Sequence, residues 1–373
     1  MIISDQVLKS NEKAMFALRE LYGMYGYSRF KMSKFEEYDL YVGNKNFLIS
    51  DNIITFTDRG GKLMALKPDV TLSIVKNSKI IPGYVEKVYY DENVYRMANE
   101  SYKEIMQVGL ECIGAVDTYT LSEVVMLAVR SLALISNDFV LDISHLGILS
   151  RVLAIMGVSD KAKAELLSAV GKKNLHAIDE ICSAEGILPE KASLLKSLVS
   201  AYGSPEKVFD SLGESANDPV IRDAKNELLD ILSPVWDAVQ SGKVRLDFSV
   251  VNDMNYYNGI VMKGFINGIP QSILSGGQYD RLLAKMGKKA GAVGFAVYPD
   301  MLEALAPSQK QYDIDTVILY DENTEPMALY NTVRLFSEGG KSVMAQKTIP
   351  EKLRYRQLLK LTESGVQILE NNA

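Results

Sequence analysis

Hydrophobic and polar positions recur with two different periods along the chain, and the changes of period divide it into three predicted parts. Apolar side chains recur at helical spacing in residues 8–26, which end at Gly26, and in the long amphipathic stretch 117–136. Short β-branched and aromatic stretches bounded by Gly, Pro, Asp or Asn predict strands at 53–59, 64–70, 86–96, 104–114 and 140–145, and residues 71–77 predict one or two helical turns.

The helical period holds from residue 147 to residue 242, which predicts a helical insertion. Ser159 and three prolines mark helix starts within it, and Pro234 should interrupt the last helix. Strand patterns resume at 244–251, 255–265, 271–276 and 292–298, and a helix is expected at 299–306. The β-rich part interrupted at residue 146 is therefore completed after residue 243.

The final segment predicts a small α/β tail, with a strand, a helix at about 325–337 and a second strand. After Pro350, the stretch KLRYRQLLK at 352–360 predicts a basic helix, and VQIL predicts a third strand. The whole pattern is typical of an α+β protein. We expect a core domain at 1–146 and 243–308, a helical insertion at 147–242 and the tail at 309–373.

Composition excludes several classes of function. The 373 residues are 47% hydrophobic and carry a net charge of -6, so the chain has no general attraction for nucleic acid. The sequence has no apolar run near ~20 residues and no basic, apolar leader, so a cytoplasmic protein without membrane contact is expected. Cys112 and Cys182 predict buried free thiols, and two histidines make a metal site or a catalytic imidazole unexpected.

Polar residues in the stretch QVGLE point to a ligand. Gln107, Gly109 and Glu111 should share one face of a strand, because side chains alternate between the two faces. Glutamine and glutamate suit an ammonium or imidazole group, and the glycine leaves room for a ligand against the sheet. A solvated strand face would give the same pattern.

Other stretches repeat this chemistry. LKPDVT supplies Asp69 and Thr71, an acid and a hydroxyl that suit an α-amino group, and the tracts NDMNYYNG and SGGQYDRLL supply Tyr256, Tyr257 and Tyr279. Each tract alone is also typical of a turn or of aromatic packing.

In this order the stretches resemble the class II aminoacyl-tRNA synthetases, and histidyl-tRNA synthetase in particular. ALKPDVT resembles that family's LRPEGT, VYR with QVGLECIG resembles motif 2, NDMNYYNG resembles RGLDYY, and SGGQYDRLL with VGFAVYPDML resembles GGRYDGL and motif 3. The resemblance covers residues 1 to about 305, plus a truncated anticodon-binding domain. It implies a mostly antiparallel sheet flanked by helices and a dimer formed through the N-terminal helix and motif 1 region.

The resemblance also implies a histidine-like pocket made by Asp69, Thr71, Gln107, Glu111, Tyr257 and Tyr279. Arg96 matches the motif 2 arginine that holds the α-phosphate of ATP; alternatively it pairs with Glu111 or Glu100.

Several positions depart from the synthetase pattern. Met301 and Asn252 stand where the family has arginines, Ser33 stands where it usually has proline, and the predicted loop MANESYKE carries Lys103 as its one cation. Because one donor to a transition state is worth roughly 3 to 4 kcal/mol, two missing arginines predict negligible amino-acid activation. We expect no catalytic residues, no cofactor and no bound metal.

A synthetase-like chain without activity resembles the regulatory subunits of ATP phosphoribosyltransferase. That resemblance implies a short-form catalytic subunit as partner, histidine as allosteric ligand, and a self-dimer within a hetero-oligomer. Two alternatives stay open at this point. One is a divergent, active histidyl-tRNA synthetase; the other is a stand-alone histidine sensor or tRNA-binding module, for which KLRYRQLLK is the basic candidate, although tRNA binding is not expected.

Overall fold

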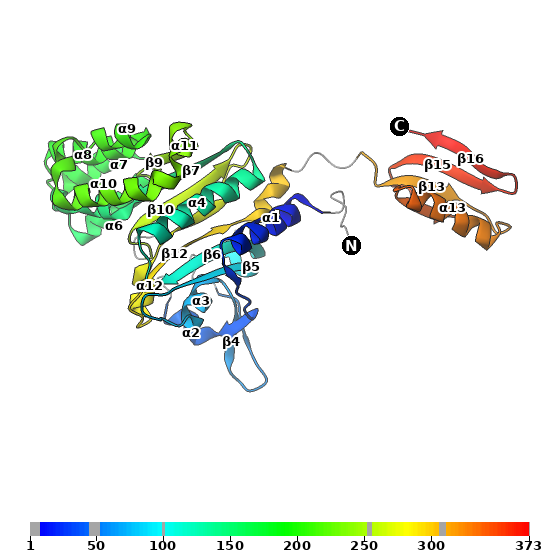
Figure 1. Ribbon diagram of the computed structural model, residues 1–373, viewed down its shortest axis with the longest axis horizontal. Coiled ribbons are helices and arrows are strands. Elements are labelled where there is room, and N and C mark those ends of the chain that lie inside the picture. The colour runs from blue at the N-terminus through cyan, green and yellow to red at the C-terminus, as the bar shows by residue number, and fades with distance from the viewer. Residues whose placement is uncertain (1–7, 45–52, 99–100, 252–255, 306–310, 373) are drawn as a thin grey trace. The chain divides into compact units, whose positions relative to one another are not determined.

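The computed structural model describes residues 8–44, 53–98, 101–251, 256–305 and 311–372 (Figure 1). The chain forms two compact units, Met1–Leu305 and Ala306–Ala373. The helical insertion clusters with the core in the larger unit, so the expected division into three domains stays a prediction.

A nine-stranded sheet organises the larger unit. Its neighbouring strands are antiparallel except for two parallel pairs, β1 with β5 and β7 with β9. In spatial order the strands are β1 (Ser28–Arg29), β5 (Val85–Ala98), β6 (Ser101–Gly114), β12 (Gly291–Val297), β11 (Leu274–Gln278), β10 (Ile260–Ile266), β7 (Phe139–His145), β9 (Val244–Asp247) and β8 (Tyr202–Gly203). The expected mostly antiparallel sheet and α+β class are confirmed.

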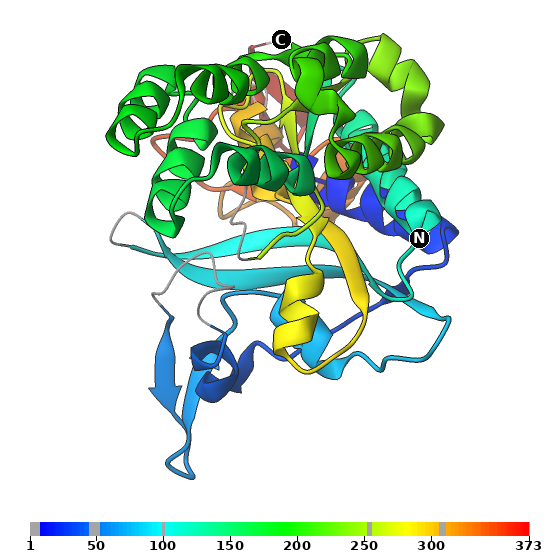
Figure 2. The ribbon, with the colours of Figure 1, turned by 90° about the vertical axis from the view of Figure 1, so that its left-hand side faces the viewer.

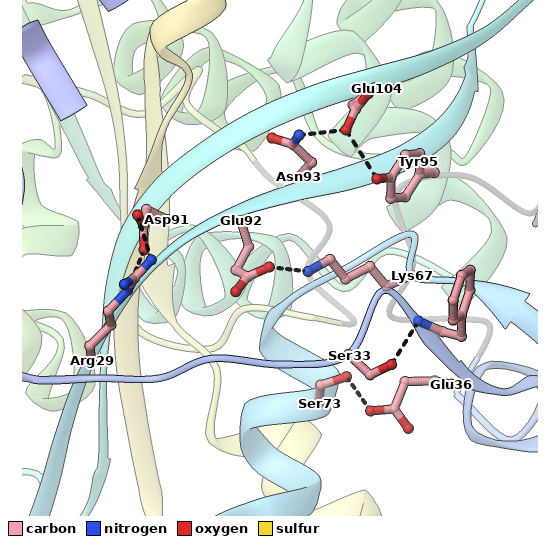
Figure 3. Close-up of polar contacts among 11 residues, drawn as sticks. Arg29, Ser33, Glu36, Lys67, Ser73, Asp91, Glu92, Asn93, Tyr95 and Glu104 are labelled. Carbon is pink, nitrogen blue, oxygen red and sulfur yellow. Dashed lines mark hydrogen bonds and ion pairs between the residues drawn. The ribbon is translucent and has the colours of Figure 1, made fainter. Parts of the chain in front are cut away.

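Strands β5 and β6 form one long hairpin, which Figure 2 shows in cyan. The predicted loop 97–104 is wrong, because the two strands stay paired as far as Ala98 and Ser101. Cross-strand contacts support this pairing: Glu104 accepts hydrogen bonds from the Tyr95 hydroxyl at 3.0 Å and the Asn93 amide at 2.5 Å (Figure 3).

Different elements cover the two faces of the sheet. Helices α1 (Ser10–Met24) and α4 (Thr118–Ile135) pack on the face that carries Val108, Leu110 and Cys112 (Figure 1). Helix α4 is long and apolar enough to cross a membrane, but more than half of its apolar window is buried, so it is a core helix. The opposite face meets α2 (Tyr38–Val42), α3 (Thr71–Asn77), α12 (Asp280–Lys285) and the small sheet β2 (Phe35–Glu37), β4 (Leu63–Leu66) and β3 (Thr55–Thr57).

The insertion lies between β7 and β9. It comprises α5 (Leu146–Met156), α6 (Asp160–Gly171), α7 (Leu175–Ala184), α8 (Pro189–Ser200), α9 (Pro205–Asp210), the 3-10 helix η2 (Gly213–Asn217), α10 (Pro219–Leu232), the 3-10 helix η3 (Ser233–Val235) and α11 (Trp236–Gln240). Ser159 caps α6, and Pro234 lies in the 3-10 turn that separates α10 from α11, as expected. The prediction of an all-helical segment is wrong at β8, whose two residues pair with β9.

Two further predictions changed form. The helix expected at 299–306 is the 3-10 helix η4 (Pro299–Leu305). The basic helix expected at 352–360 is largely strand β15 (Tyr355–Thr362), because residues alternate between two environments: Leu359 and Leu361 pack in the core, while the Arg356 guanidinium pairs with Asp315.

Strand β15 belongs to the four-stranded sheet of the smaller unit. The order is β14 (Val343–Gln346), β13 (Ile314–Leu319), β15 and β16 (Gly365–Asn371), and helix α13 (Pro326–Glu338) packs on it.

Candidate functional site

A cavity of about 440 Å³ opens on the sheet face opposite α1 and α4. This volume lies within the range of small-molecule pockets. All seven residues proposed from the sequence line the cavity: Asp69, Thr71, Arg96, Gln107, Glu111, Tyr257 and Tyr279. They come from the start of α3, from both strands of the long hairpin and from the segments that flank β10 and β11.

Glu111 lies at the centre of the polar groups. Its Oε1 accepts a hydrogen bond from the Thr71 hydroxyl at 2.9 Å, and its Oε2 accepts one from the Tyr279 hydroxyl at 2.6 Å. The side chain is 3% exposed, and burial raises its pKa to about 8, although both hydroxyl donors act in the opposite direction. An ammonium or imidazolium group beside it would favour the charged carboxylate.

Gly294 makes room for the Glu111 carboxylate. Gly294 on β12 lies opposite Glu111, and a Cβ built on Gly294 would lie 1.8 Å from Glu111 Oε2. The carboxylate therefore extends across the neighbouring strand, toward the middle of the sheet. A side chain at position 294 would displace it.

The start of α3 positions Asp69 and Thr71. Asp69 Oδ1 accepts a hydrogen bond from the Leu72 backbone N–H at 2.9 Å, which satisfies one of the free donors of the first helical turn. Burial raises the pKa of Asp69, and Arg96 partly opposes that shift. Thr71 is the first residue of the helix, so the turn that Asp69 stabilises also orients the hydroxyl that Glu111 accepts.

Arg96 contacts protein groups. Its Nε donates a hydrogen bond to the Pro68 carbonyl at 2.7 Å, its Nη2 lies 4.0 Å from Asp69 Oδ2, and the residue is 8% exposed. The alternative in which Arg96 pairs with Glu111 is therefore wrong, and Glu100 lies outside the described residues; the phosphate contact stays a prediction. Asn252 lies outside them as well.

Aromatic side chains form one wall. The ring centroids of Tyr256 and Tyr257 are 4.5 Å apart, and those of Tyr256 and Tyr279 are 5.6 Å apart. Gly109 does not leave space for a ligand as expected, since a Cβ there would lie 2.5 Å from the hydroxyl of Tyr90 on β5. Tyr90 is the cross-strand neighbour of Gly109 and fills that space.

Among the cavity residues that sequence reasoning missed are three with polar side chains: Tyr90, Lys263 and Tyr298. Lys263 carried a usable signal, because it is a charge in the middle of the apolar strand IVMKGFI. Tyr298 follows β12, and its hydroxyl lies beside Arg96 and Gln107; burial raises its pKa. No group of three or more His, Cys, Asp and Glu side chains in the described part of the chain is arranged to hold a metal ion.

Ion pairs attach two preceding segments of the chain to β5 (Figure 3). The buried Lys67 ammonium pairs with Glu92, and the Arg29 guanidinium binds both oxygens of Asp91 at 2.8 and 3.0 Å. The Lys67–Glu92 pair holds the chain that leads into α3 against the hairpin that carries Arg96.

Residues 4–302 match the family model described as histidyl-tRNA synthetase, which covers most of the chain. The chain belongs to the histidyl-tRNA synthetase family. Within that family, it is 28% identical over 344 residues to an ATP phosphoribosyltransferase regulatory subunit of Thermoanaerobacter sp. strain X514, and the match covers 89% of each chain.

Solved structures share the fold. A crystal structure of an ATP phosphoribosyltransferase regulatory subunit/histidyl-tRNA synthetase from Bacillus halodurans superposes with a TM-score of 0.73 at 23% identity, covering 92% of this chain and 91% of the other. A chain of the ATP phosphoribosyl transferase complex from Thermotoga maritima gives a TM-score of 0.62 at 19% identity, covering 80% and 98%. The class II synthetase-like fold expected from the sequence is confirmed.

Two positions that depart from the histidyl-tRNA synthetase pattern have structural roles here. Met301, in place of an arginine, is partly buried and packs against the main core. The Ser33 hydroxyl, in place of a proline, accepts a hydrogen bond from the Phe35 backbone N–H at 3.1 Å (Figure 3). Lys103 is exposed on the hairpin.

Proposed function

We propose that this chain is a non-catalytic regulatory subunit of ATP phosphoribosyltransferase in the first step of histidine biosynthesis. In this proposal it acts in the cytoplasm as a self-dimer, supports the activity of a short-form catalytic subunit and confers feedback inhibition by histidine. Histidine binds at Asp69, Thr71, Gln107, Glu111, Tyr257 and Tyr279. Inhibition requires that histidine bind two arrangements of the complex with different affinity.

The observation that carries this proposal is the cavity. It has side chains that suit an amino acid, and its Arg96 already contacts the Pro68 carbonyl and Asp69. Buried carboxylates, hydroxyls and an aromatic wall suit an amino group and an imidazole ring. The curated relatives that share 89% of their length with this chain carry the name of the regulatory subunit. That name supports a role in assembly and regulation.

The same contacts argue against amino-acid activation. The Arg96 guanidinium already contacts the Pro68 carbonyl and Asp69, and Tyr298 lies beside it. A nucleotide phosphate would have to replace these contacts. Met301 packs against the main core and carries no charge, so it cannot supply the contact to the ATP phosphates that an arginine would make at this position.

The test is reconstitution. The purified chain is mixed with a short-form catalytic subunit, complex formation is measured by size-exclusion chromatography, and phosphoribosyl transfer is assayed with and without histidine. Glu111→Ala should form the complex and support activity but lose most of the histidine inhibition. Unchanged inhibition in the Glu111→Ala complex would refute the assigned site, and failure of the native chain to bind or stimulate the catalytic subunit would refute the function.

A divergent histidyl-tRNA synthetase is the second candidate, since the family model itself carries that description. It predicts histidine-dependent exchange of pyrophosphate into ATP by the chain alone. Exchange at an enzyme-like rate would favour this candidate over the regulatory role.

A further inference from the structure

Lys263 lies at one end of the cavity, on a continuous row of residues across the sheet. Cross-strand pairing joins Lys263 to Ser275, Ser275 to Ala296, and Ala296 to Gly109. Directly opposed residues share one face of a sheet, so the whole row faces the cavity. Ser275 and Ala296 have small side chains, so the cavity stays open between Lys263 and the Glu111 carboxylate.

The carboxylate opposite Lys263 in the sheet is already paired with another side chain. The partner of Lys263 in the adjacent strand is Asp142, whose two oxygens accept hydrogen bonds from the Arg245 guanidinium at 2.8 and 3.1 Å. Among the described residues Lys263 makes no ion pair, although it lines a cavity and is partly buried. A partly buried ammonium without a counter-ion is a site for an anionic group.

The spacing suits an amino acid. Glu111 lies three strands from Lys263, but its carboxylate extends over Gly294 on the intervening strand β12. Two strand spacings, about 10 Å, then separate the carboxylate from the β10 backbone. The flexible four-carbon stem of lysine can bridge part of this distance. Arg96, the other cation of the cavity, is engaged by Pro68 and Asp69.

We infer that the Lys263 ammonium binds the α-carboxylate of the ligand, whose cationic and ring groups lie toward Asp69, Glu111 and the tyrosines. The site thereby selects free amino acids over amines and amino alcohols of the same shape. This inference rests on the proposed histidine-binding function and adds a specificity-determining residue to it.

Calorimetric titration of the full chain tests the inference with two ligands, L-histidine and L-histidinol, the amino alcohol that lacks the carboxylate. A charge-assisted hydrogen bond is worth roughly 10- to 100-fold in affinity, so the native chain should prefer histidine by about that factor. Lys263→Met should weaken histidine binding by the same factor and leave histidinol binding unchanged. Lys263→Arg should keep most of the preference.

Lys289→Met is the matched control, because Lys289 is exposed and does not line the cavity. It should behave like the native chain with both ligands. The inference is overturned if Lys263→Met weakens both ligands equally, which indicates a structural role, or if it changes neither. Absence of histidine binding by the native chain would instead refute the proposed function and this inference with it.

Discussion

Burial of Glu111 should make the stability of the larger unit depend on pH in a direction opposite to that of most acidic residues. The folded pKa is about 8 and the ordinary value is 4.5. At a pH between these two pKa values, the Glu111 carboxyl group is deprotonated in the unfolded chain and protonated in the folded chain. The free energy of unfolding therefore falls as pH rises through this window.

The magnitude follows from the two pKa values. A shift of about 3.5 units corresponds to about 5 kcal/mol in full, of which about 3.5 kcal/mol is lost between pH 5 and pH 8. Glu111→Gln cannot ionise and should lack this loss. The variant loses at most one hydrogen bond, from Thr71 or Tyr279, which lowers its free energy of unfolding by about 1 kcal/mol. The variant should therefore be slightly less stable than the native chain at pH 5 and more stable at pH 8.

Urea unfolding at pH 5, 6, 7 and 8 measures this difference. Trp236, the single tryptophan, packs against the main core and reports on the larger unit by fluorescence. Other titrating groups are shared by the two proteins and cancel in the comparison at each pH. If the native chain loses no more stability than Glu111→Gln between pH 5 and pH 8, the reasoning about the buried carboxylate is wrong.

Three further predictions follow from the cavity and its supports. Gly294→Ala should lower the free energy of unfolding by about 1 to 3 kcal/mol and abolish histidine binding, because its Cβ would displace the Glu111 carboxylate. Urea unfolding and calorimetry measure the two effects. Gly171 has open space around it, so Gly171→Ala should show neither effect in the same assays. Lys67→Met should cost about 3 to 5 kcal/mol because it leaves Glu92 unpaired, and Lys67→Met with Glu92→Met should recover part of that loss in urea unfolding. Histidine binding near pH 7 should release a proton from Glu111, which calorimetry in buffers of different ionisation enthalpy detects; a heat that does not vary with the buffer would contradict the assignment.

The sequence predicted much of the cavity lining because its signals are local. Gln107 and Glu111 alternate with apolar neighbours on one strand, and the tyrosines follow recognisable turns, so their chemistry was visible before any fold was known. That Asp69 would lie beside Arg96 required the pairing of distant segments, which no local period encodes.

The errors have physical causes as well. Gly109 and Tyr90 are neighbours across the β5–β6 hairpin. The sequence of β6 alone therefore could not show that the Tyr90 side chain fills the space beside Gly109. In residues 352–360, the order of basic and apolar side chains fits both the helical period and the alternating period of a strand. The segment forms a strand because β15 pairs with β13 and β16. The predicted loop at 97–104 looked polar, yet the two strands stay paired from Tyr95 and Glu104 to Ala98 and Ser101.

The parallel pairing of β7 with β9 limits how the helical insertion could be removed by engineering. The strands that flank it run side by side in the same direction, with Leu141 opposite Val244. A tight turn cannot join such strands, and a crossover needs about a dozen residues or more. A shortened chain would thus require a linker that spans from His145 to Val244. Any shift of the helices of the insertion would also move β7, the strand that pairs with β10 and lies beside Lys263.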